Sequence, residues 1–278
     1  MNLEWDWQPA VLLALILAAG AYLAGLLRMR SRRRLLDARR RAAFAAGLAA
    51  VFFALLSPLD GFADRSFSAH MLQHLMLMLL APPLLVYARP ATAWLWAFPL
   101  RGRRVLGRVW SGGFATGFRL LMHPVSVWLL SSLALVFWHL PGPYGWALED
   151  EGIHTFEHAC LFVTSLMFWS LVIEPYRRRQ DYPACMLLVA TFSVEMGFLG
   201  ALLTFAPRPL YAFYAHAVLP WGLDPLEDQQ IAGLVMWIPA GLVHVTTLAT
   251  LFLGWLRQAE REAQATVSRL ILPAVGGH

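Results

Sequence analysis

The sequence predicts an all-α membrane protein with seven transmembrane helices, a periplasmic N-terminus and a cytoplasmic C-terminus. Of its 278 residues, 59% are hydrophobic and 14% are charged, whereas charged residues make up about a quarter of a typical soluble domain. The apolar residues form seven runs separated by more polar connections, a pattern typical of membrane-spanning helices. All 22 basic residues are Arg, and 20 of them fall in alternate connections. We expect one integral domain over residues 1–278, with a cytoplasmic tail at 257–278.

The first two predicted spans flank an arginine-rich connection. Residues 9–27 form the first apolar run, and eight Arg follow between Arg28 and Arg41. The second run, residues 42–56, is short for a span. Because arginine is enriched in cytoplasmic loops, we expect this connection inside and the N-terminus outside.

The third predicted span covers residues 70–87 and begins with two histidines. Ser68 precedes them and is the predicted N-cap. Pro82-Pro83 lies in the inner half, where we expect a kink or an end of the regular helix. The connection at 89–122 holds six Arg and is therefore expected to be cytoplasmic.

The last four predicted spans continue the alternation. They cover residues 124–139, 154–173, 183–205 and 230–256. Arg177–Arg179 follow the fifth span, and Arg257, Arg261 and Arg269 follow the seventh. These two segments are expected to be cytoplasmic, whereas the intervening outer loops are acidic.

Two histidine pairs with i, i+4 spacing open the third and fifth spans. Residues four apart lie on one face of a helix, so His70 with His74, and His154 with His158, each present two imidazoles together. The arginine pattern places both pairs on the outer side, level with His139. Imidazole is the commonest metal ligand, and ionisable residues within spans are usually functional. We predict these two pairs as metal ligands, provided that their helices are neighbours.

Several side chains near these faces are candidate ligands or supporting groups. Thioether sulfur favours Cu(I), and Glu157, three residues after His154, is placed to orient an imidazole. Asp228 is either a helix N-cap or a hard ligand at the start of span seven. These weaker candidates are His139, Met71, Met78, Glu157, Asp228 and Met236.

Two polar residues fall well inside the predicted spans. Glu195 lies near the middle of span six, and His244 lies about 21 Å along span seven at 1.5 Å per residue. Their similar depth makes them a possible intramembrane pair, serving as a proton or metal path or as a structural hydrogen bond. A proton-coupled transporter that uses this pair is therefore one alternative function. Another is haem binding, with one histidine of each outer pair as an axial ligand.

Other functional classes find no support in the sequence. It contains no nucleophile elbow, Walker loop, HExxH, CxxC or kinase motif, so we do not expect an enzyme. The net charge of +5 is explained by membrane topology, and no nucleic-acid partner is expected.

Four separated motifs, in order along the chain, resemble those of the CtaG family of polytopic cytochrome c oxidase assembly factors, associated with caa3-type oxidases. They are His70-Met-Leu-Gln-His74 leading to Ala-Pro82-Pro83, Trp138-His139-Leu-Pro, Ile153-His154-x-x-Glu157-His158, and Asp228-Gln-Gln continuing to Met236-Trp-Ile-Pro239. The resemblance covers nearly the whole chain.

This resemblance implies a multi-pass protein of the bacterial inner membrane that matures a haem-copper oxidase by handling copper at its outer face. The implied partners are cytochrome c oxidase subunits or periplasmic copper chaperones, with membrane lipid around the protein. We expect an exposed Cu(I) site of low coordination that is open to the periplasm. A metal-free scaffold for oxidase subunits is a further alternative.

Overall fold

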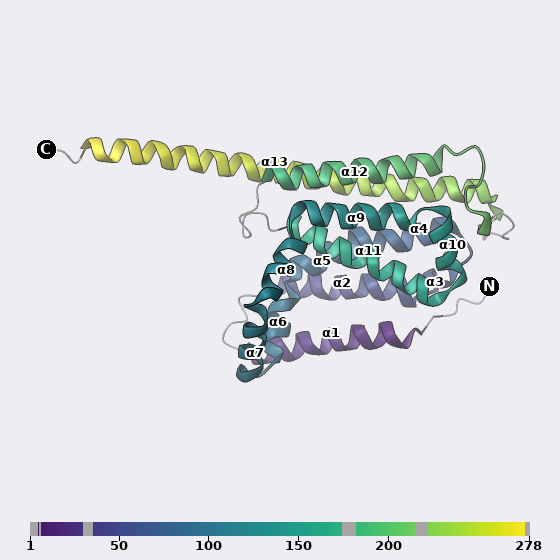
Figure 1. The fold of residues 1–278 in the computed structure, drawn as a ribbon, viewed down its shortest axis with the longest axis horizontal. Coiled ribbons are helices and arrows are strands. Elements are labelled where there is room, and N and C mark those ends of the chain that lie inside the picture. Colours follow the sequence, from purple (N-terminus) through teal and green to yellow (C-terminus); the bar gives the residue numbers. More distant parts are fainter. Residues whose placement is uncertain (1–4, 6, 30–35, 174–181, 215–221, 276–278) are drawn as a thin grey trace.

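The computed structural model of the protein (Figure 1) describes residues 5, 7–29, 36–173, 182–214 and 222–275, without the side chains of Ala212 and of residues 268–275. Every regular element in these ranges is a helix. Part of the first arginine-rich connection and Arg177–Arg179 lie outside the described residues. The helices are α1 (Pro9–Arg28), α2 (Ala38–Leu56), α3 (Pro58–Ala63), α4 (Phe67–Leu75), the π-helical segment η2 (Met76–Leu80), α5 (Ala81–Ala88), α6 (Pro90–Ala97), α7 (Leu100–Trp110), α8 (Gly113–Leu121), α9 (Pro124–Trp138), α10 (Pro141–Glu149), α11 (Glu151–Val172), α12 (Tyr182–Thr204), the 3₁₀ turn η3 (Ala212–Tyr214) and α13 (Pro225–Val275).

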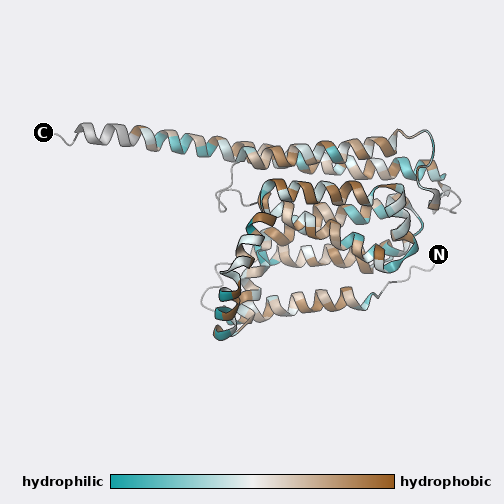
Figure 2. Ribbon diagram, in the orientation of Figure 1, coloured by the Kyte–Doolittle hydropathy of each residue, from teal (hydrophilic) through white to brown (hydrophobic). Residues whose placement is uncertain are grey.

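Five helical segments of the described chain are long and apolar enough to cross a membrane. They are α1, the continuous segment Phe67–Ala88, α11, α12 and the stretch Pro225–Val267 of α13. The pair α8 and α9, bent by 61°, is a sixth if the two helices form one span. Figure 2 shows apolar residues along these helices and polar residues gathered near the ends of the bundle and along the later part of α13. The protein is therefore a multi-pass membrane protein.

The second predicted span corresponds to helix α2, which is not among the helices that are long and apolar enough to cross a membrane. It has 19 residues, but its first turn carries Arg39, Arg40 and Arg41. The apolar part that remains is shorter than the roughly 20 residues of a typical span. Seven spans and the orientation of the termini therefore stay predictions.

The third predicted span contains an irregular turn where the two prolines were expected to disturb it. Pro82 and Pro83 have no N–H to donate four residues back, and the preceding segment Met76–Leu80 widens into a π-helix. The indole Nε1 of Trp169 donates to the carbonyl of Met78 at 2.9 Å, which supplies a partner for a group that proline leaves unpaired. The chain continues as α5, so the prolines reshape this helix without ending it.

Packing between helices sets where the site lies. Helix α4 packs on α13, and α11 packs on α9 and α5. Helices α12 and α13 run side by side (Figure 1), and a Cβ added at Gly233 of α13 would lie 2.6 Å from the Gly200 carbonyl oxygen of α12. As far as Val275, the expected tail after residue 256 continues the helix α13.

Candidate metal centre

The two histidine pairs face each other from α4 and α11. The His70 ring lies 5.2 Å from the His154 ring and 5.8 Å from the His158 ring, measured between centroids. The His74 ring lies 5.2 Å from the His158 ring. The condition that the sequence left open, that these helices be neighbours, is therefore met.

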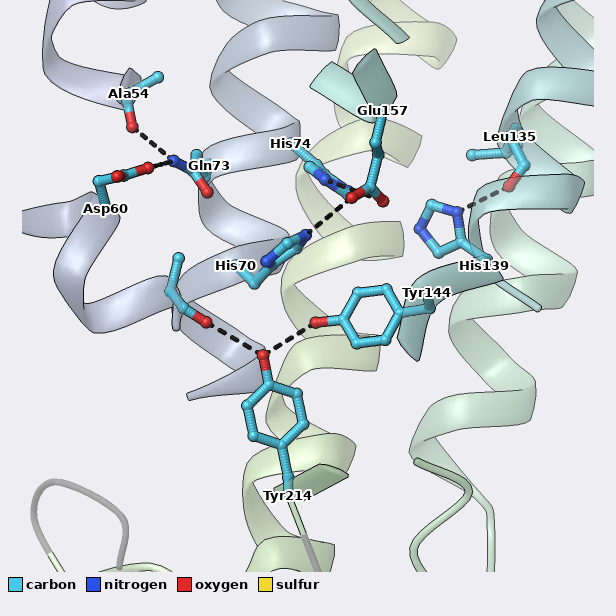
Figure 3. Close-up of polar contacts among 11 residues, drawn as sticks. Ala54, Asp60, His70, Gln73, His74, Leu135, His139, Tyr144, Glu157 and Tyr214 are labelled. Atoms are coloured by element: carbon cyan, nitrogen blue, oxygen red, sulfur yellow. Dashed lines mark hydrogen bonds and ion pairs between the residues drawn. The ribbon is translucent and has the colours of Figure 1, made fainter. Parts of the chain in front are cut away.

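Glu157 lies between the two histidines of α4 (Figure 3). Its carboxylate oxygens are 3.6 Å from His74 Nε2 and 3.9 Å from His70 Nε2, and its side chain is fully buried. Two sets of side chains bring one ligand atom each to within 4.8 Å of the others: His70, His74 and His158, and His70, His154 and Glu157. Glu157 was expected to orient an imidazole, and it is also placed as a ligand.

The unpaired ring nitrogens of this cluster fit a metal ion. Among the described residues, both nitrogens of His70 and of His74, Nε2 of His154 and His158, and both oxygens of Glu157 are buried without a hydrogen-bond partner. Buried polar groups in proteins are normally satisfied. Ligands around a tetrahedral ion at 2.0–2.1 Å lie about 3.3 Å apart, so small side-chain movements would let either set enclose an ion.

His139 joins the cluster from the end of α9. Its ring lies 5.8 Å from the His74 ring. Because a carbonyl only accepts, the 2.7 Å bond between His139 Nδ1 and the Leu135 oxygen places the proton of the neutral ring on Nδ1. A backbone partner of this kind fixes the tautomer of metal-binding histidines. The lone pair on Nε2 is then available to a metal ion.

The cluster is buried, so the prediction of an exposed site is wrong for most of its members. His70, His74 and His158 are 0%, 3% and 6% exposed. Tyr144, whose ring lies 5.0 Å from that of His70, covers the cluster. Its hydroxyl pairs with that of Tyr214 at 3.0 Å.

Further hydrogen bonds hold this tyrosine cover in place. Tyr214 donates to the Ala63 carbonyl at 3.0 Å, and Tyr211 donates to the His139 carbonyl at 2.8 Å. Burial raises the pKa of Tyr144 and Tyr211 well above the usual value, so both hydroxyls stay protonated. Tyr144 lies in α10, Tyr214 lies in η3 and Tyr211 comes just before η3, and no spacing in the sequence marks them.

One edge of the cluster reaches a large cleft. His154 and His158 line a cavity of about 820 Å³ between α1, α2, α5, α6 and α11, whose other walls are mostly apolar. His154 is the partly exposed member of the four. Access to the cluster from this side is therefore more open than access through the tyrosines.

Asp228 is not among the groups that converge on this cluster. One carboxylate oxygen accepts from the Ser66 and Ser68 hydroxyls and the other accepts from the Phe67 N–H at 2.6 Å. Asp228 of α13 thus holds the start of α4, and with it the first histidine pair. The actual N-cap of α4 is Ser66, whose Oγ accepts from the Ala69 N–H at 3.3 Å. The prediction of Ser68 as the cap is wrong because Asp228 engages Ser68.

The three candidate methionines line one small cavity beside the cluster. Met71, Met78 and Met236 share it with His74, His139 and Met196. Met196 was not predicted, because a methionine on a uniformly apolar helix such as α12 gives no signal in the sequence.

The structure does not join Glu195 and His244. Neither ring nitrogen of His244 has a hydrogen-bond partner among the residues described, and neither does Oε2 of Glu195. The His244 ring lies instead among three aromatic rings, with centroids 6.2 Å from Phe168, 6.4 Å from Trp169 and 6.1 Å from Phe192.

Comparison with known proteins identifies relatives along most of the chain. A family model described as cytochrome c oxidase caa3 assembly factor, Caa3_CtaG, matches residues 20–258. This match confirms the resemblance inferred from the four motifs. No solved structure gives a significant match.

The curated relatives are uncharacterized proteins of mycobacteria. One from Mycobacterium bovis and one from Mycobacterium tuberculosis are each 29% identical over 273 residues, which is 93% of this chain and 40% of theirs. One from Mycobacterium leprae is 30% identical over 264 residues, covering 90% of this chain and 39% of its own. The chain thus spans about 40% of the length of the relatives it matches.

Proposed function

The chain belongs to the cytochrome c oxidase caa3 assembly factor family, and from that premise we propose that it binds copper and delivers it to the oxidase during assembly. The observation that carries this proposal is the convergence of four histidines and Glu157 from α4 and α11. His70, His74, His154 and His158 are the proposed ligands. Copper is cargo in this scheme, and the protein has no catalytic role.

The ligand chemistry suits copper more than the hard cations. Imidazole nitrogen binds copper well, whereas Mg²⁺ and Ca²⁺ prefer oxygen ligands. The nearby thioethers of Met71 and Met78 add a preference for Cu(I). His154 and His158, on the wall of the cleft, are the members from which copper would leave.

We place the protein in the bacterial inner membrane with seven spans, its N-terminus in the periplasm and its C-terminus in the cytoplasm. The 20 arginines in alternate connections support this orientation. In this arrangement α2 is the second span and completes the seven, with Arg39–Arg41 reaching toward the headgroups. The histidine cluster then lies at the periplasmic end, where an oxidase subunit or a periplasmic copper chaperone would meet it.

Copper loading of the purified protein tests the proposal. The wild type, loaded anaerobically with Cu(I), is expected to retain copper after desalting, and the variant His70→Ala/His154→Ala is expected to retain less. His123→Asn is the matched control, because His123 is exposed, caps α9 through Val125, and is replaced by another capping residue. A wild type without copper, or a double variant that retains as much as the wild type, would overturn the proposal.

Haem binding is the second candidate, and the cleft favours it. A cavity of about 820 Å³ with two histidines on an otherwise mostly apolar wall is of the size of sites that bury bulky apolar ligands. A Soret band in the protein as isolated, lost in His154→Ala/His158→Ala, would decide for haem. Normal oxidase assembly after replacement of all five outer histidines would instead favour a metal-free scaffold.

A further inference from the structure

Four methionines meet at a single small cavity that adjoins the histidine cluster at His74 and His139, whereas the large cleft adjoins it at His154 and His158. The cavity is about 10 Å³ and is lined by Met71, His74, Leu75, Met78, Leu135, His139, Met196 and Met236. These four are drawn from the ten methionines of the chain. They come from α4, η2, α12 and α13, so only the tertiary fold assembles them.

The size and lining of this cavity restrict what it can hold. The cavity volume of about 10 Å³ is about the smallest that can hold one water molecule. An organic ligand is therefore too large for it. Water needs two to four hydrogen-bonding partners, and thioether sulfur is a weak acceptor. A single soft cation matches four thioethers and two imidazoles better.

The methionines are held in place by their neighbours. All four are at most 4% exposed. Met78 lies in the π-helical segment, and Trp169 fixes its backbone through the 2.9 Å bond to its carbonyl. Single π-helical turns often mark functional sites in proteins. Here the wider turn sets which side chains of the segment reach the cavity: Met78 lines it, whereas Met76 packs on a separate apolar cluster.

The two histidines that line the cavity connect it to the proposed copper ligands. His74 belongs to one of the two ligand sets, with His70 and His158. His139 carries its proton on Nδ1, bonded to the Leu135 carbonyl, so its Nε2 lone pair is free for a cation. The cavity and the histidine cluster are therefore adjacent and share His74.

We propose that Met71, Met78, Met196 and Met236, with His139, form a second Cu(I) site behind the histidine cluster. This inference rests on the proposed function, since it concerns the same cargo. Thioether sulfur is a soft ligand that favours Cu(I), so the site stores copper in the cuprous state. His74 lies between both positions, and copper passes from one to the other by exchange of ligands, without a change of oxidation state.

X-ray absorption at the copper edge, on detergent-solubilised protein loaded with Cu(I), tests this site. The wild type is expected to show sulfur as well as nitrogen scattering, and the quadruple Met→Leu variant at these positions is expected to lose the sulfur contribution. Copper content should fall from about two ions to about one, because the histidine cluster and the methionine site are each proposed to hold one Cu(I), and thioethers are the soft ligands that favour it. Leucine preserves volume and apolar character.

The chain offers a matched control. Met76, Met122, Met167 and Met186 lie outside the cavity, and the quadruple Met→Leu variant at those positions is expected to keep the sulfur scattering and the copper content of the wild type. Loss of sulfur scattering in this control would overturn the assignment to the cavity.

A second variant covers the case in which the cavity variant does not fold. His70→Ala/His154→Ala leaves the methionines intact and is expected to retain Cu(I) with a larger share of sulfur scattering. If this variant retains no sulfur-bound copper, the second site is wrong.

The outcomes separate the two proposals. A wild type that binds Cu(I) with nitrogen or oxygen scattering alone overturns the methionine site and leaves the proposed function standing. A wild type that binds no Cu(I) overturns both.

Discussion

The histidine cluster and His244 both contain buried ring nitrogens that have no hydrogen-bond partner within the described part of the chain, but their surroundings differ. His70 has two other histidines within 5.2 Å, His74 and His154, measured between ring centroids, and a carboxylate beside it. His244 has Phe168, Trp169 and Phe192 around it. The histidine cluster can surround a cation with several lone pairs, whereas His244 offers a single imidazole enclosed by aromatic side chains.

The difference shows that an unsatisfied buried nitrogen alone does not identify a metal site. An orphaned group costs about 1–3 kcal/mol wherever it is buried. Only convergence of several such groups lets one ligand satisfy them together. We therefore expect changes in the cluster to alter copper binding and changes at His244 to alter stability alone.

Glu157→Gln is the strongest test of this contrast. Replacing the carboxyl group beside His70 and His74 with an amide is expected to lower Cu(I) affinity by up to about 100-fold, the range found when groups supporting a metal site are replaced. Competition with a chromophoric Cu(I) chelator measures this loss. An affinity within twofold of the wild type would show that the carboxylate neither binds the copper ion nor orients the imidazoles.

Asp228→Asn separates the ligands from the framework that holds them. The Asp228 carboxylate anchors the start of α4 through Ser66, Phe67 and Ser68, and bonds to a charged group are worth about 1.5–3 kcal/mol each. We expect a loss of about 2 kcal/mol in stability, read as a lower thermal midpoint in detergent.

Asp224→Asn is the matched control for that experiment. Asp224 is exposed, and its side chain accepts from the nearby Leu226 N–H at 3.2 Å, a role that asparagine retains. Its thermal midpoint should match the wild type. Equal midpoints for the two variants would contradict the anchoring role of Asp228.

His244→Leu sharpens the other side of the comparison. Replacing an imidazole that has no partner with an apolar side chain removes a desolvation penalty, so we expect a gain of about 1 kcal/mol in stability. Copper content and affinity should equal those of the wild type. A variant that loses copper would make His244 part of the copper path and would contradict the view that His244 affects stability alone.

Tyr211→Phe has the smallest expected effect. It removes the bond to the His139 carbonyl, worth about 0.5–1.5 kcal/mol, and leaves every proposed ligand in place. The thermal midpoint should fall slightly while copper stoichiometry is unchanged. A loss of copper on this change would show that the tyrosine cover positions His139 as a ligand.

Local spacing was enough to predict which histidines face each other in the candidate site. The pairs His70 with His74 and His154 with His158 were found because helical periodicity puts them on one face, and Glu157 followed from its spacing to His154. The burial of the cluster was not predictable in this way, because Tyr144 and Tyr214 reach it from α10 and η3, two elements that are distant in the sequence. Met196 was missed for the same reason, since its partners lie on other helices.

The sequence by itself determined the class, the approximate helices and the family, because hydropathy, charge pattern and motifs are local properties of the chain. The tertiary structure decided which polar groups meet. It brought α4 beside α11, and it placed Asp228 where its carboxylate bonds the start of α4, 161 residues away in the sequence. It also left His244 without Glu195. These outcomes depend on contacts between distant segments, whose energies no local pattern encodes.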